Sequence, residues 1–198
     1  MKTKTTLIWW VGWGLWVAMF TIVGYKNLDP DFGWHVRAGE YVMQKGIAKT
    51  DPFSYTMPSY PFIDHEWLTN VVMYLVTEHY GYGALAVIFG LLAGGLWLLL
   101  VPKRGVLLAL IPVLMGAGAW LVRAGVRPQI LDWLFLAGLL RLVWQEKVWK
   151  KWRWWVVPGF GLWANLHGGY AIGPAVLGVI IVLKAWEKKQ ADRTDVAI

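Results

Sequence analysis

Residues 29–67 read DPDFGWHVRAGEYVMQKGIAKTDPFSYTMPSYPFIDHEW and form the one long polar stretch in a chain of 198 residues. This stretch holds half of the 12 acidic residues, and apolar runs lie on both sides of it. Only 16% of the chain is charged, whereas about a quarter of a soluble domain is charged. Several runs approach or exceed the roughly 18 apolar residues that indicate a transmembrane helix. The sequence therefore predicts an all-α, polytopic membrane protein.

The composition also narrows the possible functions. The absence of cysteine excludes disulfides, thiolate metal sites and cysteine nucleophiles. A formal net charge of +7 would suggest a nucleic-acid partner in a soluble protein. In a membrane protein the same excess is typical of basic cytoplasmic loops that face anionic lipid, so we expect membrane lipid as a partner and no nucleic acid.

Six apolar runs predict six membrane spans. They cover residues 7–24, 84–101, 106–122, 130–144, 154–166 and 171–186. With the N-terminus inside, 13 of the 19 Lys and Arg residues fall in cytoplasmic segments. The positive-inside rule therefore places both termini in the cytoplasm and the polar loop, residues 25–82, outside the plasma membrane. The first run could instead be a signal peptide, but no small-x-small cleavage site follows it.

We expect residues 1–186 to form a single membrane domain and residues 187–198 a disordered cytoplasmic tail. Within the outer loop, Asp31 and Gly46 predict the start and stop of a short helix over residues 32–45. Residues 50–63 carry three prolines among aromatic residues and predict an irregular loop. The spacing of apolar residues over 67–80 predicts an amphipathic helix that lies in the membrane interface.

Two carboxylates, Asp29 and Asp31, directly follow the first predicted span. Such a pair could hold a divalent cation (Mg²⁺ or Mn²⁺) through oxygen ligands, or supply a general base. The alternative is a solvated turn in which Asp31 only caps the following helix. The triplet Asp64-His65-Glu66 offers a second group of ionisable side chains, or else a simple helix cap.

Further polar residues lie in the short connections that the topology places outside. Arg123 and Arg127 could grip a phosphate, or could extend to lipid headgroups. Asn165 and His167 end a fifth run that is short and interrupted by proline and glycine, a pattern that can mark a site in membrane proteins. A plain loop is the alternative there. Asp132, near the outer end of the fourth run, is a functional candidate because ionisable residues inside a membrane are costly.

Five motifs together resemble a group of bacterial multi-pass GT-C glycosyltransferases, which are related to lipid-A and protein O-mannosyl transferases. They are DPDFGWHVRAGEYVMQKG, TDPFSYT, DHEWLTNVVMYLV, RPQ and LWANLHGGY, and the resemblance covers residues 1–186. It implies an enzyme that takes a sugar from a polyprenyl-phosphate carrier at the outer face. Members of that group usually have more spans, so a second chain could supply missing helices. A non-catalytic module or subunit that binds lipid-linked sugar is the alternative function.

The resemblance also implies roles for the polar residues of these motifs. The acidic motif of the first outer loop falls on Asp29 or Asp31. The expected catalytic residues are Asp29, Asp31, His65 and Glu66. The expected substrate-binding residues are His35, Arg37, Arg123, Arg127, Gln129, Asn165 and His167.

Overall fold

The structure is a computed structural model that describes residues 2–57, 59–121 and 125–195. Helices account for 79% of the chain, and the described residues form no strand, so the all-α prediction is confirmed. The helices are α1 (Lys2–Lys26), α2 (Phe32–Lys45), α3 (Trp67–Leu100), α4 (Val106–Leu121), α5 (Ile130–Trp144), α6 (Glu146–Trp152), α7 (Val156–Leu166) and α8 (Ile172–Asp195), with 3₁₀ turns η1 (Arg153–Trp155) and η2 (Gly168–Ala171).

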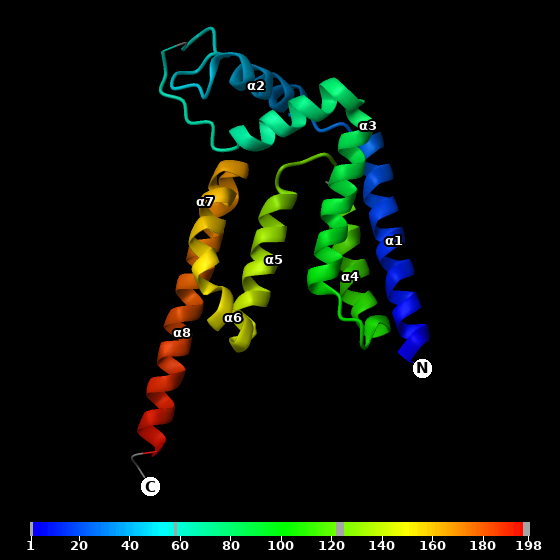
Figure 1. The fold of residues 1–198 in the computed structure, drawn as a ribbon, viewed down its shortest axis with the longest axis vertical. Helices are drawn as coiled ribbons and strands as arrows, with labels where there is room; N and C mark the ends of the chain where they lie inside the picture. Colours follow the sequence, from blue (N-terminus) through cyan, green and yellow to red (C-terminus); the bar gives the residue numbers. More distant parts are fainter. Residues whose placement is uncertain (1, 58, 122–124, 196–198) are drawn as a thin grey trace.

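Figure 1 shows α2 and the first half of α3 together at one end of the molecule, with the other long helices running away from them. Both ends of the chain lie toward the opposite end of the molecule, beyond the short helix α6. The polar segment 29–67 therefore forms one end of the molecule, here called the polar end.

Three helices are long and apolar enough to cross a membrane, over Lys4–Lys26, Trp67–Leu100 and Gly168–Glu187, and a shorter apolar helix covers Val106–Gly116. These helices are compatible with a membrane protein. Helices α5 and α7 have 15 and 11 residues, or about 22 and 16 Å, which is less than a hydrocarbon core of roughly 30 Å. The count of six spans therefore stays a prediction.

Helix α3 is two helices joined at a kink. Gly81 has a φ of 75° and a ψ of 172°, a backbone conformation that only glycine adopts without strain. The kink separates the amphipathic stretch 67–80 from an apolar helix that turns down along α1, as Figure 1 shows. The expected break between residues 80 and 84 is therefore present. Whether the first half lies in a membrane interface stays a prediction.

Glycines let α1 and α3 approach closely. A Cβ atom at Gly90 would lie 2.0 Å from the Thr21 hydroxyl, and one at Gly94 would lie 2.6 Å from a Val17 methyl. Small residues spaced by four allow this close approach in membrane helices, where packing replaces the hydrophobic effect. Gly90 and Gly94 form such a pair, and the contact they permit is here called the α1–α3 seam.

Tryptophans of α1 stabilise the α1–α3 seam through hydrogen bonds. The indole N–H groups of Trp13 and Trp16 donate to the α3 carbonyls of Gly94 and Ala93 at 3.1 and 2.9 Å. The Trp9 indole donates to the carbonyl of Val101, directly after α3, at 3.0 Å. The large aromatic surface is thus buried while its one polar group has a partner.

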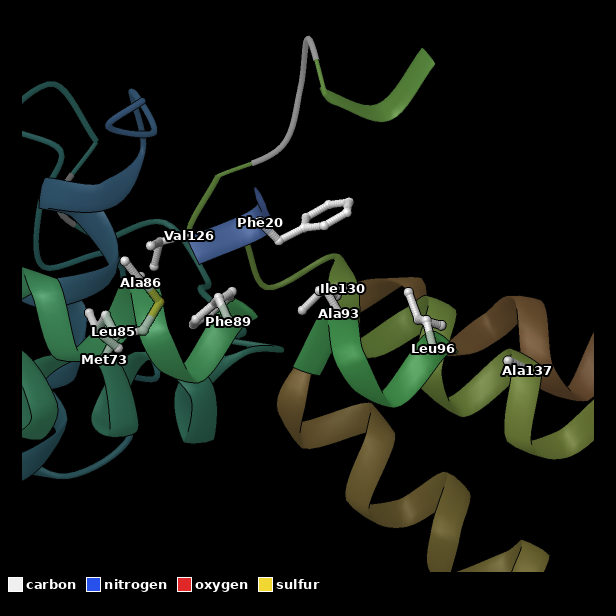
Figure 2. Packing of buried hydrophobic residues seen from close by; sticks show 10 residues of the cluster. All are labelled: Phe20, Met73, Leu85, Ala86, Phe89, Ala93, Leu96, Val126, Ile130 and Ala137. Carbon is white, nitrogen blue, oxygen red and sulfur yellow. The ribbon is translucent and has the colours of Figure 1, made fainter. Parts of the chain in front are cut away.

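The main apolar core lies where α1, α3 and α5 meet. It consists of ten buried residues, whose arrangement is shown in Figure 2: Phe20, Met73, Leu85, Ala86, Phe89, Ala93, Leu96, Val126, Ile130 and Ala137. Val126 and Ile130 belong to the connection that leads into α5 and to its first turn. Their burial positions that connection against the polar end.

The outer loop packs through α2. A Cβ atom at Gly39 would lie 2.0 Å from the Asn70 carbonyl oxygen, so α2 crosses the first half of α3 in direct backbone contact. Trp34 stacks edge-on against Phe53 with ring centroids 4.6 Å apart, which ties the irregular loop 50–63 to α2.

Two predicted boundaries can be compared directly. Helix α2 begins and ends where the sequence predicts, and Gly46 stops it with a φ of 81°. Helix α8 continues through Asp195. The expected disorder of residues 187–198 stays a prediction.

Candidate functional site

Four polar segments that are far apart in the sequence meet in one pocket at the polar end. The pocket has a volume of about 840 Å³. It is lined by residues from α2 and the turn before it, from the start of α3, from the turn before α5 and from the α7–α8 connection: Asp31, Trp34, His35, His65, Glu66, Gln129, His167, Gly168 and Tyr170. Five of these residues are acidic or histidine, in contrast to the apolar helices below.

Asp29 lies behind this pocket and does not line it. Its carboxylate is buried, and Oδ2 lies 2.5 Å from Arg127 Nε while Oδ1 accepts the backbone N–H of Asp31 at 2.9 Å. This ion pair joins the end of α1 to the turn before α5. Asp29 and Arg127 therefore position the two segments on either side of the pocket.

Asp31 takes a different position, although it is only two residues away. Its backbone carbonyl accepts the N–H of His35 and so begins α2, but its side chain makes no capping hydrogen bond. The Asp31 carboxylate is exposed to the pocket, and it has no ion pair among the described residues. The structure thus separates the two carboxylates into a buried partner of Arg127 and a pocket residue.

A buried hydrogen-bonded chain holds His35 at the pocket floor. His35 Nδ1 lies 2.8 Å from Asn70 Oδ1, and Asn70 Nδ2 donates to Asp64 Oδ1 at 3.1 Å. The same Asp64 oxygen accepts the backbone N–H of Glu66 at 3.2 Å. Since Asn70 Oδ1 can only accept, we assign a proton to His35 Nδ1.

His167 sits between two carboxylates. Its Nδ1 lies 2.6 Å from Asp132 Oδ2, and its Nε2 lies 3.7 Å from Glu66 Oε2. The other Asp132 oxygen accepts the indole N–H of Trp163 at 2.6 Å. The Gly169 amide also lies 3.2 Å from Nδ1, but the closer carboxylate can only accept, so we assign the proton to Nδ1.

This arrangement favours the charged form of His167. Burial opposes the imidazolium, but the hydrogen bond and charge of Asp132, together with the charge of Glu66, outweigh it and raise the pKa of His167 above its ordinary value. His167 therefore places positive charge at the pocket over a wider pH range than a free histidine.

The start of α3 and the end of α7 are joined directly. Trp67 Nε1 donates to Asn165 Oδ1 at 2.6 Å, and the Thr69 hydroxyl donates to the Leu166 carbonyl at 2.5 Å. Gly168 packs under the His65 ring, because a Cβ atom there would lie 2.5 Å from His65 Cδ2. A glycine at this position is thus needed for His65 to lie over the α7–α8 connection.

Most of the predicted site residues come together here. Asp31, His35, His65, Glu66, Gln129 and His167 line the pocket. Asn165 is engaged by Trp67 at its edge, whereas Arg37 pairs with Glu40 on the exposed face of α2. Arg123 lies outside the described residues.

The predicted divalent cation has little support from the aspartate pair. Both Asp29 oxygens are engaged, one of them by a guanidinium, so this carboxylate is poorly arranged to share a cation with Asp31. No group of three or more His, Asp or Glu side chains among the described residues is arranged to hold a metal ion. A metal requirement stays a prediction.

Some residues at the pocket lie within the sequence motifs but are not among the expected site residues. Trp34 and Tyr170 line the pocket, and Asn70 orients His35 from the buried face of α3. Asn70 looks like a polar residue on the solvated face of an amphipathic helix, so only the crossing of α2 over α3 identifies its role. Asp132, in contrast, is identifiable from the sequence as a functional candidate, because it is an ionisable residue within an apolar run.

No protein-family model, curated protein or solved structure matches the chain.

Proposed function

We propose that the protein is a membrane glycosyltransferase that moves a sugar from a polyprenyl-phosphate carrier to an acceptor at the extracytoplasmic face. The observation that supports this proposal is the convergence of the DPDFGWH, DHEW, RPQ and NLHGG segments on one pocket. Residues 31 and 167 belong to the first and last of these segments, and both reach the same pocket of about 840 Å³.

The proposed topology has six spans with both termini in the cytoplasm. Both ends of the chain lie away from the polar end, which agrees with an even number of crossings (Figure 1). Together with the Lys and Arg asymmetry, this arrangement supports a pocket on the outer face. The short helices α5 and α7 then cross as part of a locally thinned or partly polar region.

Asp31 is the proposed general base. Glycosyl transfer forms a bond between the acceptor oxygen and the anomeric carbon, while the bond from that carbon to the phosphate oxygen breaks. The acceptor proton passes to the Asp31 carboxylate, and polyprenyl phosphate leaves with the bonding electrons. A carboxylate without an ion pair and open to the pocket suits this role, whereas Asp29, whose oxygens are engaged, does not.

His167 is the proposed cation for the donor phosphate. Asp132 fixes the ring and supports its positive charge, so Nε2–H is directed toward the side of the pocket where Glu66 lies. Gln129 adds an amide to the same wall. Because Arg127 is occupied by Asp29, the phosphate-binding role expected for Arg127 passes to His167 in this proposal.

The second candidate is a non-catalytic subunit that binds lipid-linked sugar. Helix α8 supports it, because only 6% of its apolar window is buried, compared with 44% for α3. Such an exposed helix offers a face to lipid or to a second chain that would complete the site.

Sugar transfer from a polyprenyl-phosphate donor, measured with purified protein in lipid, separates these functions. The enzyme should transfer sugar, and Asp31→Asn should lower the rate by about 10²–10⁴-fold while donor binding is kept. Parallel reactions with Mg²⁺ or with a chelator test the cation. Donor binding without transfer by the intact chain would instead support the subunit function, and full activity of Asp31→Asn would refute the assignment of the base.

The topology has its own test in this cysteine-free chain. Single cysteines at Ser59, Gly168 and Gln190 can be labelled with a membrane-impermeant reagent in intact cells and in inverted vesicles. We expect the first two to react from outside and the third from the cytoplasm. The reverse pattern at Ser59 and Gly168 would place the pocket inside and overturn the proposed orientation.

A further inference from the structure

A second, apolar cavity lies between α5 and α7, and Trp163, which donates to Asp132, lines it at the end nearer the polar end. Its volume is about 310 Å³, at the lower end of the roughly 300–1,000 Å³ found for ligand pockets. None of its lining residues is ionisable. It runs along α5 from Leu134 to Leu142, which is about 12 Å of helix. These features fit an elongated hydrocarbon chain.

Glycines widen this cavity. Gly138 of α5 and Gly159 of α7 both line it, and a Cβ atom built at either position would meet no atom within 4 Å. These glycines therefore face open space. Gly90 and Gly94 differ, because there the missing side chain lets a neighbouring helix approach closely. The absence of a side chain at both positions keeps the cavity open.

A basic, tryptophan-rich segment closes the end of the cavity that lies away from the polar end. Residues 145–155 contain four cationic side chains and one carboxylate, Glu146, which pairs with Lys150. Lys147, Lys151 and Arg153 supply the remaining charge, and we call residues 145–155 the basic belt. Lys151 lies 5.2 Å from the ring of Trp152, which itself lines the cavity.

The tryptophans of this belt are placed as at a membrane interface. Trp154 and Trp155 are 74% and 66% exposed, although tryptophan is usually well buried in folded proteins. Exposed indole rings beside Lys and Arg are typical of the headgroup region of a bilayer. The belt thus offers cations at the level of lipid phosphates, directly next to an apolar cavity.

We propose that the α5–α7 cavity and the basic belt form a binding site for one anionic phospholipid, with an acyl chain in the cavity and the phosphate on Lys147, Lys151 and Arg153. Figure 1 shows α6, which carries most of the belt, at the far side of the molecule from α2. The site is therefore separate from the polar pocket, and the inference does not depend on the proposed function.

The first test removes the positive charges of Lys147, Lys151 and Arg153 and keeps the Lys150–Glu146 ion pair. Protein in neutral detergent is titrated with phosphatidylglycerol or phosphatidylcholine of the same acyl chains, and bound lipid is counted by native mass spectrometry. Wild type should prefer phosphatidylglycerol. Each interfacial cation contributes about five-fold, so K147Q/K151Q/R153Q should reduce that preference by one to two orders of magnitude. K103Q/R104Q, at another basic turn, is the matched control and should keep it.

The second test fills the cavity. Gly138→Leu should lower retention of both lipids because the new side chain occupies the acyl-chain position. Gly178→Leu on α8 is the control, since a Cβ atom there also meets open space but lies outside this cavity. A thermal midpoint in lipid-free detergent that equals wild type shows that each variant is folded.

Three results would overturn the inference. One is equal affinity of wild type for the two lipids, and another is an unchanged preference in the triple variant. The third is full lipid retention by folded Gly138→Leu. Inorganic phosphate that binds as tightly as phosphatidylglycerol would likewise exclude a role for the acyl chain.

Discussion

The α1–α3 seam and the contact between α5 and α7 use the same residue types for opposite purposes. In the first, Gly90 and Gly94 are covered by α1, and the Trp13 and Trp16 indoles donate to α3 carbonyls. In the second, Gly138 and Gly159 face a cavity, and Trp155 is mostly exposed. Glycine and tryptophan content therefore does not indicate how tightly two helices pack, because the partner surface decides it.

At the polar end α5 and α7 are in direct contact, and Phe135 of α5 stacks on Trp163 of α7 with ring centroids 5.3 Å apart. There Asp132 of α5 binds both Trp163 of α7 and His167 just after it. Apolar packing thus holds one part of the protein, and a buried polar cluster holds the other. This difference can be tested by substitutions on each side.

The largest effect is expected at Gly90. In Gly90→Leu the new side chain has to displace Thr21 and the backbone of Val17, so we expect a loss of about 3 kcal/mol in stability, the upper end for overpacking. Gly138→Leu should be neutral or stabilising, because its Cβ atom meets open space. Unfolding by denaturant in mixed micelles measures both variants. Equal destabilisation of the two would contradict the contrast between the helix contacts.

Asp132→Asn should have the next largest effect. The loss of a charge-assisted hydrogen bond to His167 should cost about 1.5–3 kcal/mol. Since the folded-state pKa of His167 is raised, this pair stabilises the fold fully below the unfolded pKa, and the contribution disappears as the pH rises through the folded value.

The pH dependence gives Asp132 a readout beyond stability. In Asp132→Asn the pKa of His167 should fall, so the alkaline limb of sugar-transfer activity should move to lower pH. Glu66 and His65 also line the pocket near His167, and Glu66→Gln should shift the limb less because its oxygen lies 3.7 Å away. An unchanged pH profile in Asp132→Asn would remove the positioning role.

Arg127→Met tests the ion pair with Asp29, which joins the end of α1 to the turn before α5. It leaves the buried Asp29 carboxylate without its cation, but Arg127 is itself about one-third exposed, so water can partly replace it. We expect a loss of about 1–2 kcal/mol, below the value for a fully buried pair. Donor affinity should change little, because Arg127 does not line the pocket. A large rise in KM with unchanged stability would restore the phosphate-binding role for Arg127.

The smallest effect is expected from the indole hydrogen bonds. Trp16→Phe keeps most of the aromatic surface but loses the bond to Ala93, which should cost about 0.6–1 kcal/mol. Trp155→Phe should stay within about 0.5 kcal/mol because that ring is largely exposed. Thermal midpoints of the two variants in one detergent give the comparison.

Local sequence determines the helices well. Asp31 and Gly46 bound α2, and Gly81 breaks α3. At the two glycines the reason is local, because a positive φ is a property of a single residue. The apolar runs likewise predict α1, α4, α5 and α8, since helices in an apolar stretch satisfy their own backbone. The collection of polar residues at one end also follows from the order of these runs.

Only the tertiary structure separates residues that look equivalent in the sequence. Asp29 and Asp31 are two residues apart, yet one is buried against Arg127 and the other faces the pocket, because the turn before α5 supplies the guanidinium from about a hundred residues away. Gly90 and Gly138 differ for the same reason, since burial depends on which surface lies opposite. Sequence by itself determined where α2 begins and ends and where α3 kinks. Packing decided which carboxylate pairs with Arg127 and which one lines the pocket.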